Sequence, residues 1–241
     1  MIDIHSHILP GLDDGVATIE EARELARTTV ADGVTAIAAT PHVRDDYPTT
    51  PEQMEAGVAA LRADFAAEGI PLEVLHGGEL ALESVGSLSD DDLRRFTIGQ
   101  TGRYLLLEFP YFGWPLALRS IVFNLQLKGF TALLAHPERN GEVQAAPERL
   151  RELVDAGVGV QVTAASIDGR GGRTARRTAR ALIELGFVHA IASDAHSPSL
   201  REAGVAAAAR ELDDEDLARF LTVEAPAAIA AGRALPGRFR G

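Results

Sequence analysis

Two histidines stand one residue apart near the start of the chain, in the stretch IDIHSHILPGLDDG. Successive side chains of a strand point to opposite faces, so His5 and His7 point the same way, together with Asp3. Three polar side chains on one face of a short strand are not ordinary core residues. That face is therefore either wet or supplies nitrogen and oxygen ligands to an ion. Ser6 lies on the opposite face, where we expect it to pack.

The same residue types recur later in the chain, each near the end of a predicted strand. Histidines occur in the segments TPH, AHPERN and SDAH, and acids occur in LDDG, HGGEL, LLLEFP and SDAH. Nitrogen and oxygen ligands without sulfur suit Zn²⁺, Mn²⁺ or iron. The predicted ligands are His5, His7, Asp14, His42, Glu79, Glu108, His136, Asp194 and His196.

This set is too large for one ion. Clustered cations repel, and carboxylates are needed to neutralise them, with Glu79 well placed to bridge two ions. We therefore expect at least two ions and favour three. His76 and His189 each precede a strand-end acid by a few residues, and we assign both to structural roles. Asp3 either orients a ligand or is a buried polar group of the fold.

Short apolar runs alternate with longer helical patterns along the chain. This alternation predicts a parallel sheet, and seven units without a glycine-rich dinucleotide loop favour a barrel over an open sheet. The carboxyl ends of barrel strands meet at one rim, which would bring the predicted ligands together. Strands are predicted at 1–8, 34–40, 71–80, 103–110, 130–137, 157–165 and 187–196. Helices are predicted at 18–32, 51–68, 115–128, 147–156, 173–185 and 200–211.

The composition is that of an ordinary soluble domain, with 241 residues that fit a single domain over 1–241. The tail from about residue 214 reads as helical, with a frayed end. A net charge of −12 argues against nucleic acid and anionic membranes as partners. The chain has no cysteine, which excludes disulfides and a thiolate nucleophile. No signal peptide and no apolar run of about 20 residues is present, so we expect a cytoplasmic protein without membrane insertion.

The motifs resemble those of a known superfamily. The stretches DIHSHILPGLDDG, TPH, LLEFP, LQLKGFTALLAHPERN and SDAH look like those of the polymerase-and-histidinol-phosphatase (PHP) superfamily. Within it, they are most similar to the manganese-dependent protein-tyrosine phosphatases encoded with bacterial capsular and exopolysaccharide genes. The resemblance covers about residues 1–201.

The resemblance implies an α/β fold, a distorted TIM-like (β/α)7 barrel of the PHP type with a three-metal cluster. It carries over the nine predicted ligands, with Mn²⁺ favoured over Fe or Zn. It also implies that Arg139 and Arg201 bind phosphate. The implied partner is the phosphotyrosine tail of a bacterial tyrosine kinase, and the implied outcome is control of polysaccharide assembly.

The expected chemistry is hydrolysis of phosphomonoesters by attack of a metal-bound hydroxide. Arg139 and Arg201 would stabilise charge in the transition state, and His42 or His196 would supply a proton to the leaving group. The alternatives are a small-molecule phosphatase acting on histidinol phosphate or a nucleotide, a metal-dependent amidohydrolase, and a metal-free regulatory module. Short loops favour a protein substrate. Oligomeric state, substrate and metal identity stay open.

Overall fold

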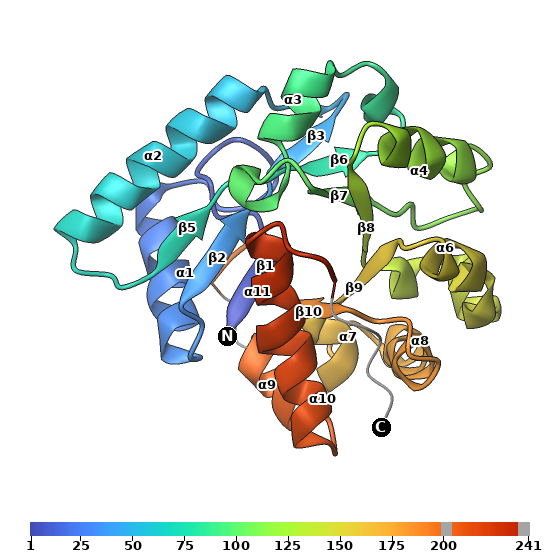
Figure 1. The fold of residues 1–241 in the computed structure, drawn as a ribbon. Coiled ribbons are helices and arrows are strands. Elements are labelled where there is room, and N and C mark those ends of the chain that lie inside the picture. The colour runs from blue at the N-terminus through green and yellow to red at the C-terminus, as the bar shows by residue number, and fades with distance from the viewer. Residues whose placement is uncertain (199–203, 236–241) are drawn as a thin grey trace.

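Strands and helices alternate along the chain, as Figure 1 shows for the computed structural model, which describes residues 1–198 and 204–235. The strands are β1 (Ile2–Ser6), β2 (Ala36–Ala39), β3 (His42–Arg44), β4 (Tyr47–Pro48), β5 (Glu73–Leu75), β6 (Glu79–Ala81), β7 (Tyr104–Glu108), β8 (Thr131–Ala135), β9 (Gly159–Thr163) and β10 (Ala190–Ala192). The helices are α1 (Ile19–Ala31), α2 (Pro51–Ala67), α3 (Asp90–Arg95), α4 (Leu118–Leu127), α5 (Gly141–Ala145), α6 (Arg151–Asp155), α7 (Ala164–Asp168), α8 (Arg173–Glu184), α9 (Val205–Arg210), α10 (Glu215–Arg219) and α11 (Ala225–Ala230).

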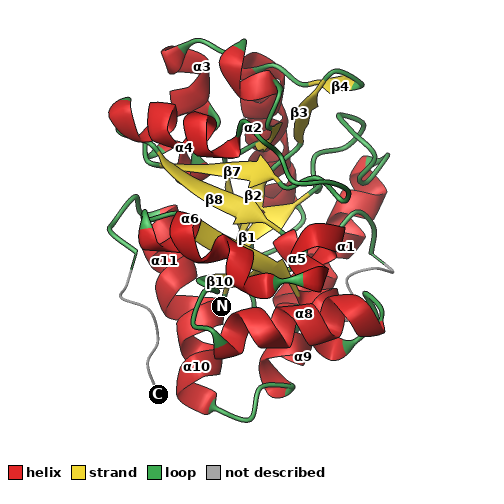
Figure 2. Cartoon of the chain, turned by 90° about the vertical axis from the view of Figure 1, so that its right-hand side faces the viewer, coloured by secondary structure: helices red, strands yellow, loops and turns green. Residues whose placement is uncertain are grey.

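The strands form two sheets. β1, β2 and β5 make a three-stranded parallel sheet. The second sheet has the order β10-β9-β8-β7-β6-β3-β4 and is parallel except for the antiparallel pair β3 and β4. Figure 2 shows the strands at the centre with helices around them. The prediction of an α/β fold with parallel strands is confirmed, although the strands are hydrogen-bonded into two sheets rather than one.

Backbone contacts join the two sheets where β1 and β10 end. Ser6 forms an isolated parallel bridge with Ala195. The N–H of Asp194 donates to the carbonyl of His5, and the N–H of His7 donates to the carbonyl of Ala195, both at 2.9 Å. β1 and β10 therefore deliver their last residues to the same place, although they belong to different sheets.

Two of the predicted strands are wrong in detail. The predicted strand 71–80 is divided into β5 and β6, which pair in different sheets, and between them Gly78 lies so close to Phe96 that a Cβ there would stand 2.6 Å from Cδ1 of the ring. The glycine pair in HGGEL is the local signal for such a close approach. The predicted strand 157–165 ends at Thr163, where α7 begins. The short pair β3 and β4 was not predicted, because only three and two residues form it.

Most predicted helices are confirmed within a few residues. α2 begins with a capping box between Thr50 and Gln53 and with Pro51 in its first turn, as the sequence indicates. The segment 147–156 is a 3₁₀ turn followed by α6. α3 was not predicted, although Ser89 and Asp92 form a capping box there. The tail is helical over 215–230, and part of the predicted helix 200–211 lies outside the described residues.

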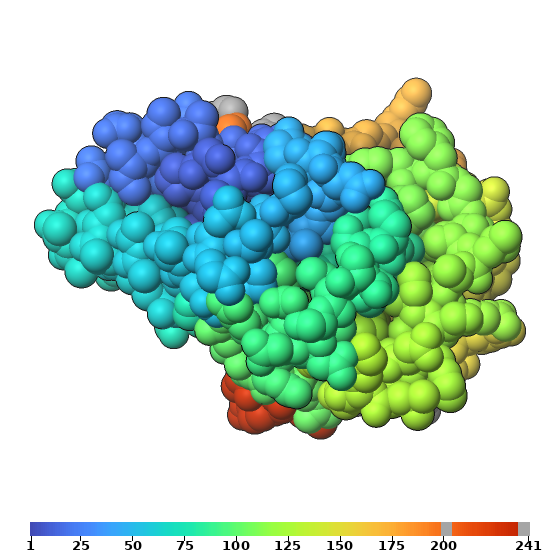
Figure 3. Space-filling model, turned by 90° about the horizontal axis from the view of Figure 1, so that it is seen from above, coloured from blue at the N-terminus to red at the C-terminus, as the bar shows by residue number. Residues whose placement is uncertain are grey.

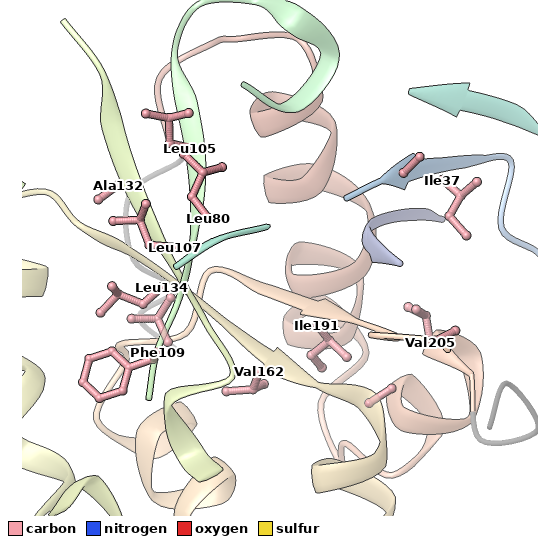
Figure 4. Close-up of a cluster of buried hydrophobic side chains, with 14 of the residues drawn as sticks. Ile37, Leu80, Leu105, Leu107, Phe109, Ala132, Leu134, Val162, Ile191 and Val205 are labelled. Carbon is pink, nitrogen blue, oxygen red and sulfur yellow. The ribbon is translucent and has the colours of Figure 1, made fainter. Parts of the chain in front are cut away.

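Apolar side chains cover both faces of the central strands. Along β7 and β8, Leu105, Leu107 and Leu134 join a large cluster that includes Ile37 and Val162 (Figure 4). The alternate residues Leu106 and Leu133 join a second cluster with side chains from both sheets and from α11. Burial on both faces is the usual environment of parallel strands. Among the described residues, no helix combines the length and apolar character needed to cross a membrane.

Replacement of Leu134 by alanine tests the packing of this core. Leu134 is fully buried, so Leu134→Ala leaves a cavity and is expected to lower the free energy of unfolding by about 2–5 kcal/mol. Urea denaturation followed by circular dichroism measures the change. The matched control is Leu127→Ala, whose side chain is 71% exposed and whose loss should change stability by less than about 0.5 kcal/mol. Equal effects of the two substitutions would contradict the packing described.

Candidate metal centre

The predicted ligands come from the carboxyl ends of strands in both sheets. His5 lies in β1 and His7 follows it, while His136 follows β8 and Asp194 follows β10. The structure brings eight of the nine predicted residues into three overlapping groups, in each of which the candidate donor atoms lie within 4.8 Å of one another. These eight residues, named the donor cluster here, are His5, His7, Asp14, His42, Glu79, His136, Asp194 and His196.

Two histidine nitrogens of the cluster lie at ligand spacing from each other and from two carboxylates, Glu79 and Asp194, which belong to different groups. Nε2 of His5 and Nε2 of His7 are 3.3 Å apart. Each lies 3.4 Å from Oε2 of Glu79 and 3.3 or 3.4 Å from Oδ1 of Asp194. A tetrahedral ion with bonds of about 2.0–2.1 Å separates neighbouring donors by about 3.3–3.4 Å. The donor set and its spacing therefore fit a divalent metal.

Buried atoms without hydrogen bonds point the same way. Nδ1 of His42 and Oε2 of Glu79 are both buried. They lie 3.0 Å apart but without the geometry of a hydrogen bond, and neither has another hydrogen-bond partner. Buried polar atoms are normally paired, and a bound cation would satisfy such a group. The other oxygen of Glu79 contacts Nε2 of His136 at 2.9 Å. Glu79 thus touches donors of more than one group, which is the position of a bridging carboxylate.

A further group lies toward the surface. Oδ1 of Asp14 is 3.4 Å from Nε2 of His42 and 3.5 Å from Nε2 of His196. The rings of His7 and His196 stack with centroids 3.9 Å apart. Asp14 is the most exposed member of the cluster, so this group faces the side from which a substrate would arrive.

Opposite charges hold the buried groups of the cluster in their charged forms. Burial alone would lower the pKa of His7, but contacts with Asp13, Asp194 and Glu79 raise it well above its usual value. Burial is the largest single influence on the carboxyls of Glu79 and Asp194 and would raise their pKa, but His5 and the other adjacent cationic groups together outweigh it, so the pKa of both carboxyls is lowered. Metal ligands must be deprotonated, so ion binding here would release protons from the histidines.

Two residues that were not predicted orient the histidines. Oδ2 of Asp13 lies 2.7 Å from Nδ1 of His7 and accepts the N–H of His42 at 2.9 Å. Burial would raise the pKa of Asp13, but His7 lowers it to about 2. Oε1 of Gln161 lies 3.0 Å from Nδ1 of His5. Such partners fix the ring so that Nε2 points into the site.

A glycine lets the loop of Asp13 lie against β1. A Cβ at Gly15 would stand 2.2 Å from the carbonyl oxygen of His7, so no other residue fits without a shift of the loop. Asp13 is the first acid of LDDG, and its position beside the predicted Asp14 was its only sequence signal, whereas Gln161 carried none.

Glu108 is the predicted ligand that the structure does not place in a group. Its Oε1 accepts a hydrogen bond from Nη1 of Arg44 at 3.1 Å, and its Oε2 is 3.8 Å from Nδ1 of His42. Burial and the neighbouring Glu79 raise the pKa of Glu108. Arg44, which was not predicted, also lies 3.6 Å from Asp14. Glu108 therefore lies at the edge of the donor cluster, and its role as a ligand stays a prediction.

Arg139 lies beside the donor cluster. Its Nη1 is 2.9 Å from Oδ2 of Asp194 and donates to the hydroxyl of Tyr111 at 3.2 Å. The ring of Tyr111 is stacked over His136, with centroids 6.0 Å apart. Arg201, the other predicted phosphate ligand, lies outside the described residues.

The backbone is strained at two cluster residues. His136 has a φ of 38° and Asp194 a φ of 53°, in the left-handed region that residues other than glycine seldom adopt. Each residue follows directly after or close to a strand end. Strain of this kind costs about 1–3 kcal/mol and gathers at functional sites.

The remaining predicted residues have structural contacts. Nδ1 of His189 accepts the N–H of Val160, and neither His76 nor His189 belongs to a ligand group. Ser6 donates its hydroxyl to the carbonyl of Ala38 at 2.7 Å. Oδ1 of Asp3 accepts the N–H of Ser193 at 3.0 Å, so of the two interpretations the structure favours a buried polar group that links β1 to the segment after β10.

The chain is similar in sequence to a family of capsular polysaccharide synthesis proteins and to tyrosine-protein phosphatases. The family described as "Capsular polysaccharide synthesis, CpsB/CapC" matches residues 1–230. The chain is 36% identical over 204 residues to the tyrosine-protein phosphatase YwqE of Bacillus subtilis (strain 168), covering 83% of this chain and 79% of the relative. It is 32% identical over 200 residues to the putative tyrosine-protein phosphatase CapC of Staphylococcus aureus, covering 82% and 77%.

Solved structures agree with the sequence comparison. A chain described under "Crystal structures of YwqE from Bacillus subtilis and CpsB from Streptococcus pneumoniae, unique metal-dependent tyrosine phosphatases" aligns with a TM-score of 0.85 and 30% identity, covering 100% of both chains. A β-aspartyl dipeptidase from Fervidobacterium islandicum AW-1 aligns with a TM-score of 0.58 and 13% identity, covering 100% of this chain and 78% of that one. The second likeness concerns the fold alone.

Substitution of Asp13 tests its orienting role. Asp13→Asn weakens the hold on Nδ1 of His7 and is expected to lower the affinity for divalent ions about 10- to 100-fold. Titration of the metal-stripped protein with Mn²⁺ or Zn²⁺, with bound metal measured by mass spectrometry, gives the affinity. Asp45→Asn makes the same change on an exposed residue nearby and should leave the affinity unaltered. Wild-type affinity in Asp13→Asn would refute the role.

Proposed function

The chain belongs to the capsular polysaccharide synthesis family CpsB/CapC, and we propose that it is a metal-dependent tyrosine-protein phosphatase. The observation that carries the proposal is the ligand spacing of His5 and His7 from each other and from the carboxylates of Glu79 and Asp194, with Arg139 directly beside Asp194. Donors for cations next to a guanidinium suit a phosphate ester, because the cations and the guanidinium can both bind its oxygens.

The centre is proposed to hold three divalent ions, with Mn²⁺ favoured and Fe or Zn as alternatives. The three overlapping groups of donors support the number, and donors without sulfur support these metals. Glu108 would complete the set from its place at the edge of the cluster.

The two sheets are proposed to close into the distorted PHP-type barrel expected from the motifs. The contacts of Ser6 and His5 with the segment after β10 support closure, as does the passage of β2 into β3 through only two residues. The family match over 1–230 supports a single domain.

The reaction is hydrolysis of the phosphate ester of tyrosine. Divalent ions, when bound, activate water and neutralise the charge of the phosphoryl group. Arg139 binds the phosphoryl oxygens through its guanidinium, which Asp194 and Tyr111 hold in place. The half-exposed ring of Tyr111 offers an apolar face to the phenyl ring of the substrate.

Proton return to the leaving group falls to a histidine at the mouth of the site. A phenolate leaves more easily than an alkoxide and needs less help from an acid. The side chain of His196 is 25% exposed and that of His42 only 6%, so His196 is the better placed of the two to pass a proton through a water molecule, since its Nε2 would itself hold a metal ion.

The proposed substrate is the phosphotyrosine-bearing tail of a bacterial tyrosine kinase that acts in capsule synthesis. The names of the relatives and the family support this choice. The surface beside Arg139 supports a protein rather than a metabolite, because Tyr111 is half exposed and Phe112 almost fully exposed next to it. A pocket for histidinol phosphate or a nucleotide would enclose its ligand. Arg139 makes amide hydrolysis the weaker alternative, and the donor spacing speaks against a metal-free module.

A substrate panel tests the function. The full chain, assayed with Mn²⁺, Fe²⁺ and Zn²⁺, is expected to give its highest kcat/KM on a phosphotyrosine peptide, above phosphoserine peptide, histidinol phosphate and nucleotides. Removal of metal with a chelator should abolish turnover, and added metal should restore it. A preference for histidinol phosphate would support the small-molecule alternative. Undiminished turnover in protein shown to be free of metal would refute the metal-dependent reaction.

Removal of Arg139 tests phosphate binding. Arg139→Ala is expected to lower kcat on p-nitrophenyl phosphate about 100- to 1,000-fold, because one preorganised donor to the transition state is lost. Metal content must be measured in parallel, since Arg139 contacts Asp194. The control is Arg119→Ala. Arg119 lies in α4 with a side chain that is 71% exposed, so its loss should leave turnover unchanged. Near wild-type turnover with the metals retained would exclude the role.

A further inference from the structure

Four arginines gather on one side of α8, although the protein as a whole carries a charge of −12. The helix has the sequence RTARRTARALIE, and its buried residues are small or apolar. The other side lines a shallow hollow of about 620 Å³ with four arginines and, at the carboxyl end of the helix, with one acid, Glu184. The arginine face, as we name it, consists of Arg173, Arg176, Arg177 and Arg180.

The positive charges of these arginines are only partly neutralised by carboxylates of the described part of the chain. Arg176 pairs with Glu211 at 2.9 Å, and Arg180 lies 3.9 Å from the same carboxylate. Arg173 and Arg177 form no ion pair with any described residue. Two guanidinium groups therefore have no anion among the described residues, and two share one.

Their position on the helix adds to the cost. The amino end of a helix carries partial positive charge, so cations in the first turns are unfavourable there, and like charges four residues apart repel. Arg173 with Arg177 and Arg176 with Arg180 are such pairs, and the first turn of α8 contains no acid. A bound anion would relieve all of these repulsions at once.

A second hollow connects this face with the metal centre. It measures about 540 Å³ and is lined by Tyr111 and Arg139 on one side and by Gly171, Gly172 and Arg173 on the other. Arg173 lines both hollows. The two glycines carry no side chains to obstruct the path. In Figure 3 the yellow-orange part of the chain projects beside the green part at the edge of the molecule.

We infer that the arginine face binds an acidic or phosphorylated segment of the polypeptide substrate while another residue of that substrate occupies the metal centre. This inference rests on the proposed function, because it assumes a phosphotyrosine beside Arg139. A continuous path from Arg139 to Arg173 favours one extended chain over two separate ligands. The overall negative charge, with the arginines confined to one helix, favours a peptide over a nucleic acid or a membrane surface.

The length of the face limits how many residues of the peptide can contact it, and the second hollow separates those residues from the phosphotyrosine beside Arg139. Arg173 and Arg180 are seven residues apart on the helix, which spans about 10 Å, or about three residues of extended chain. Anionic side chains several residues away from the phosphotyrosine, rather than adjacent to it, would therefore meet these arginines. A second phosphotyrosine and a run of acidic residues share the chemistry required.

The test compares substrates in wild type and in the double variant Arg173→Ala/Arg177→Ala. The substrates are p-nitrophenyl phosphate, a phosphotyrosine peptide with neutral flanks, one with acidic residues four to eight positions away, and one with a second phosphotyrosine there. The double variant loses the two exposed ion pairs that Arg173 and Arg177 would form with an anionic peptide. This loss is expected to raise KM for the two anionic peptides about 5- to 30-fold, with kcat unchanged. The first two substrates should be unaffected. The control is Arg27→Ala/Arg119→Ala, which removes two exposed arginines elsewhere.

The outcomes separate this inference from the proposed function. Turnover of the neutral phosphotyrosine peptide by wild type reports on the function, and the change in KM between peptides reports on the arginine face. Equal KM values in wild type and variant, or equal changes for all substrates, would overturn the inference.

If no substrate is turned over, the arginine face can still be tested by measuring the binding of a peptide directly. Fluorescence anisotropy of a labelled anionic peptide should then show weaker binding to the double variant than to wild type, with the difference fading at high salt. Equal binding would overturn the inference. Tighter binding of wild type to an oligonucleotide or to anionic vesicles than to the peptide would also overturn it.

Discussion

The carboxylate of Glu79 is the constraint on which the site depends. It is completely buried, and a buried charge is tolerated only when partners surround it. Its partners are four imidazoles, contacted at 2.9–3.4 Å: His5, His7, His42 and His136. The histidines lie in or directly after β1, β3 and β8, strands of different sheets, so the position of one carboxylate ties the two sheets to a single point.

The fold meets this constraint through its irregular parts. The division of the predicted strand 71–80 places Glu79 at the start of β6, after the glycine pair that lets the chain approach Phe96. The backbone contacts of His5 and His7 with the segment after β10 bring Asp194 to the same point. The clusters of apolar side chains on both faces of β7 and β8 supply the rigidity that holds them.

Local sequence patterns indicated which candidate donors the structure brings together, but not the residues that orient them. The strand-end positions of His5, His136 and Asp194 could be read from apolar runs, because parallel strands end at a shared edge. The contact of Gln161 with His5 joins residues 156 positions apart, and no periodicity reports such a pair. The pairing of Glu108 with Arg44 likewise depends on the short strand β3, which two-residue alternation cannot reveal. Helix starts such as Thr50 were predictable because capping chemistry is local.

The left-handed backbone at His136 and Asp194 sets stability against activity in this chain. Glycine would relax both positions, yet glycine has no donor atom to offer. Selection of variants for heat resistance alone would therefore favour glycine at these two positions. The selected variants would gain stability and lose two donors of the site. Ancestral or stabilised versions of the chain are best sought at surface and core positions, where no such conflict exists.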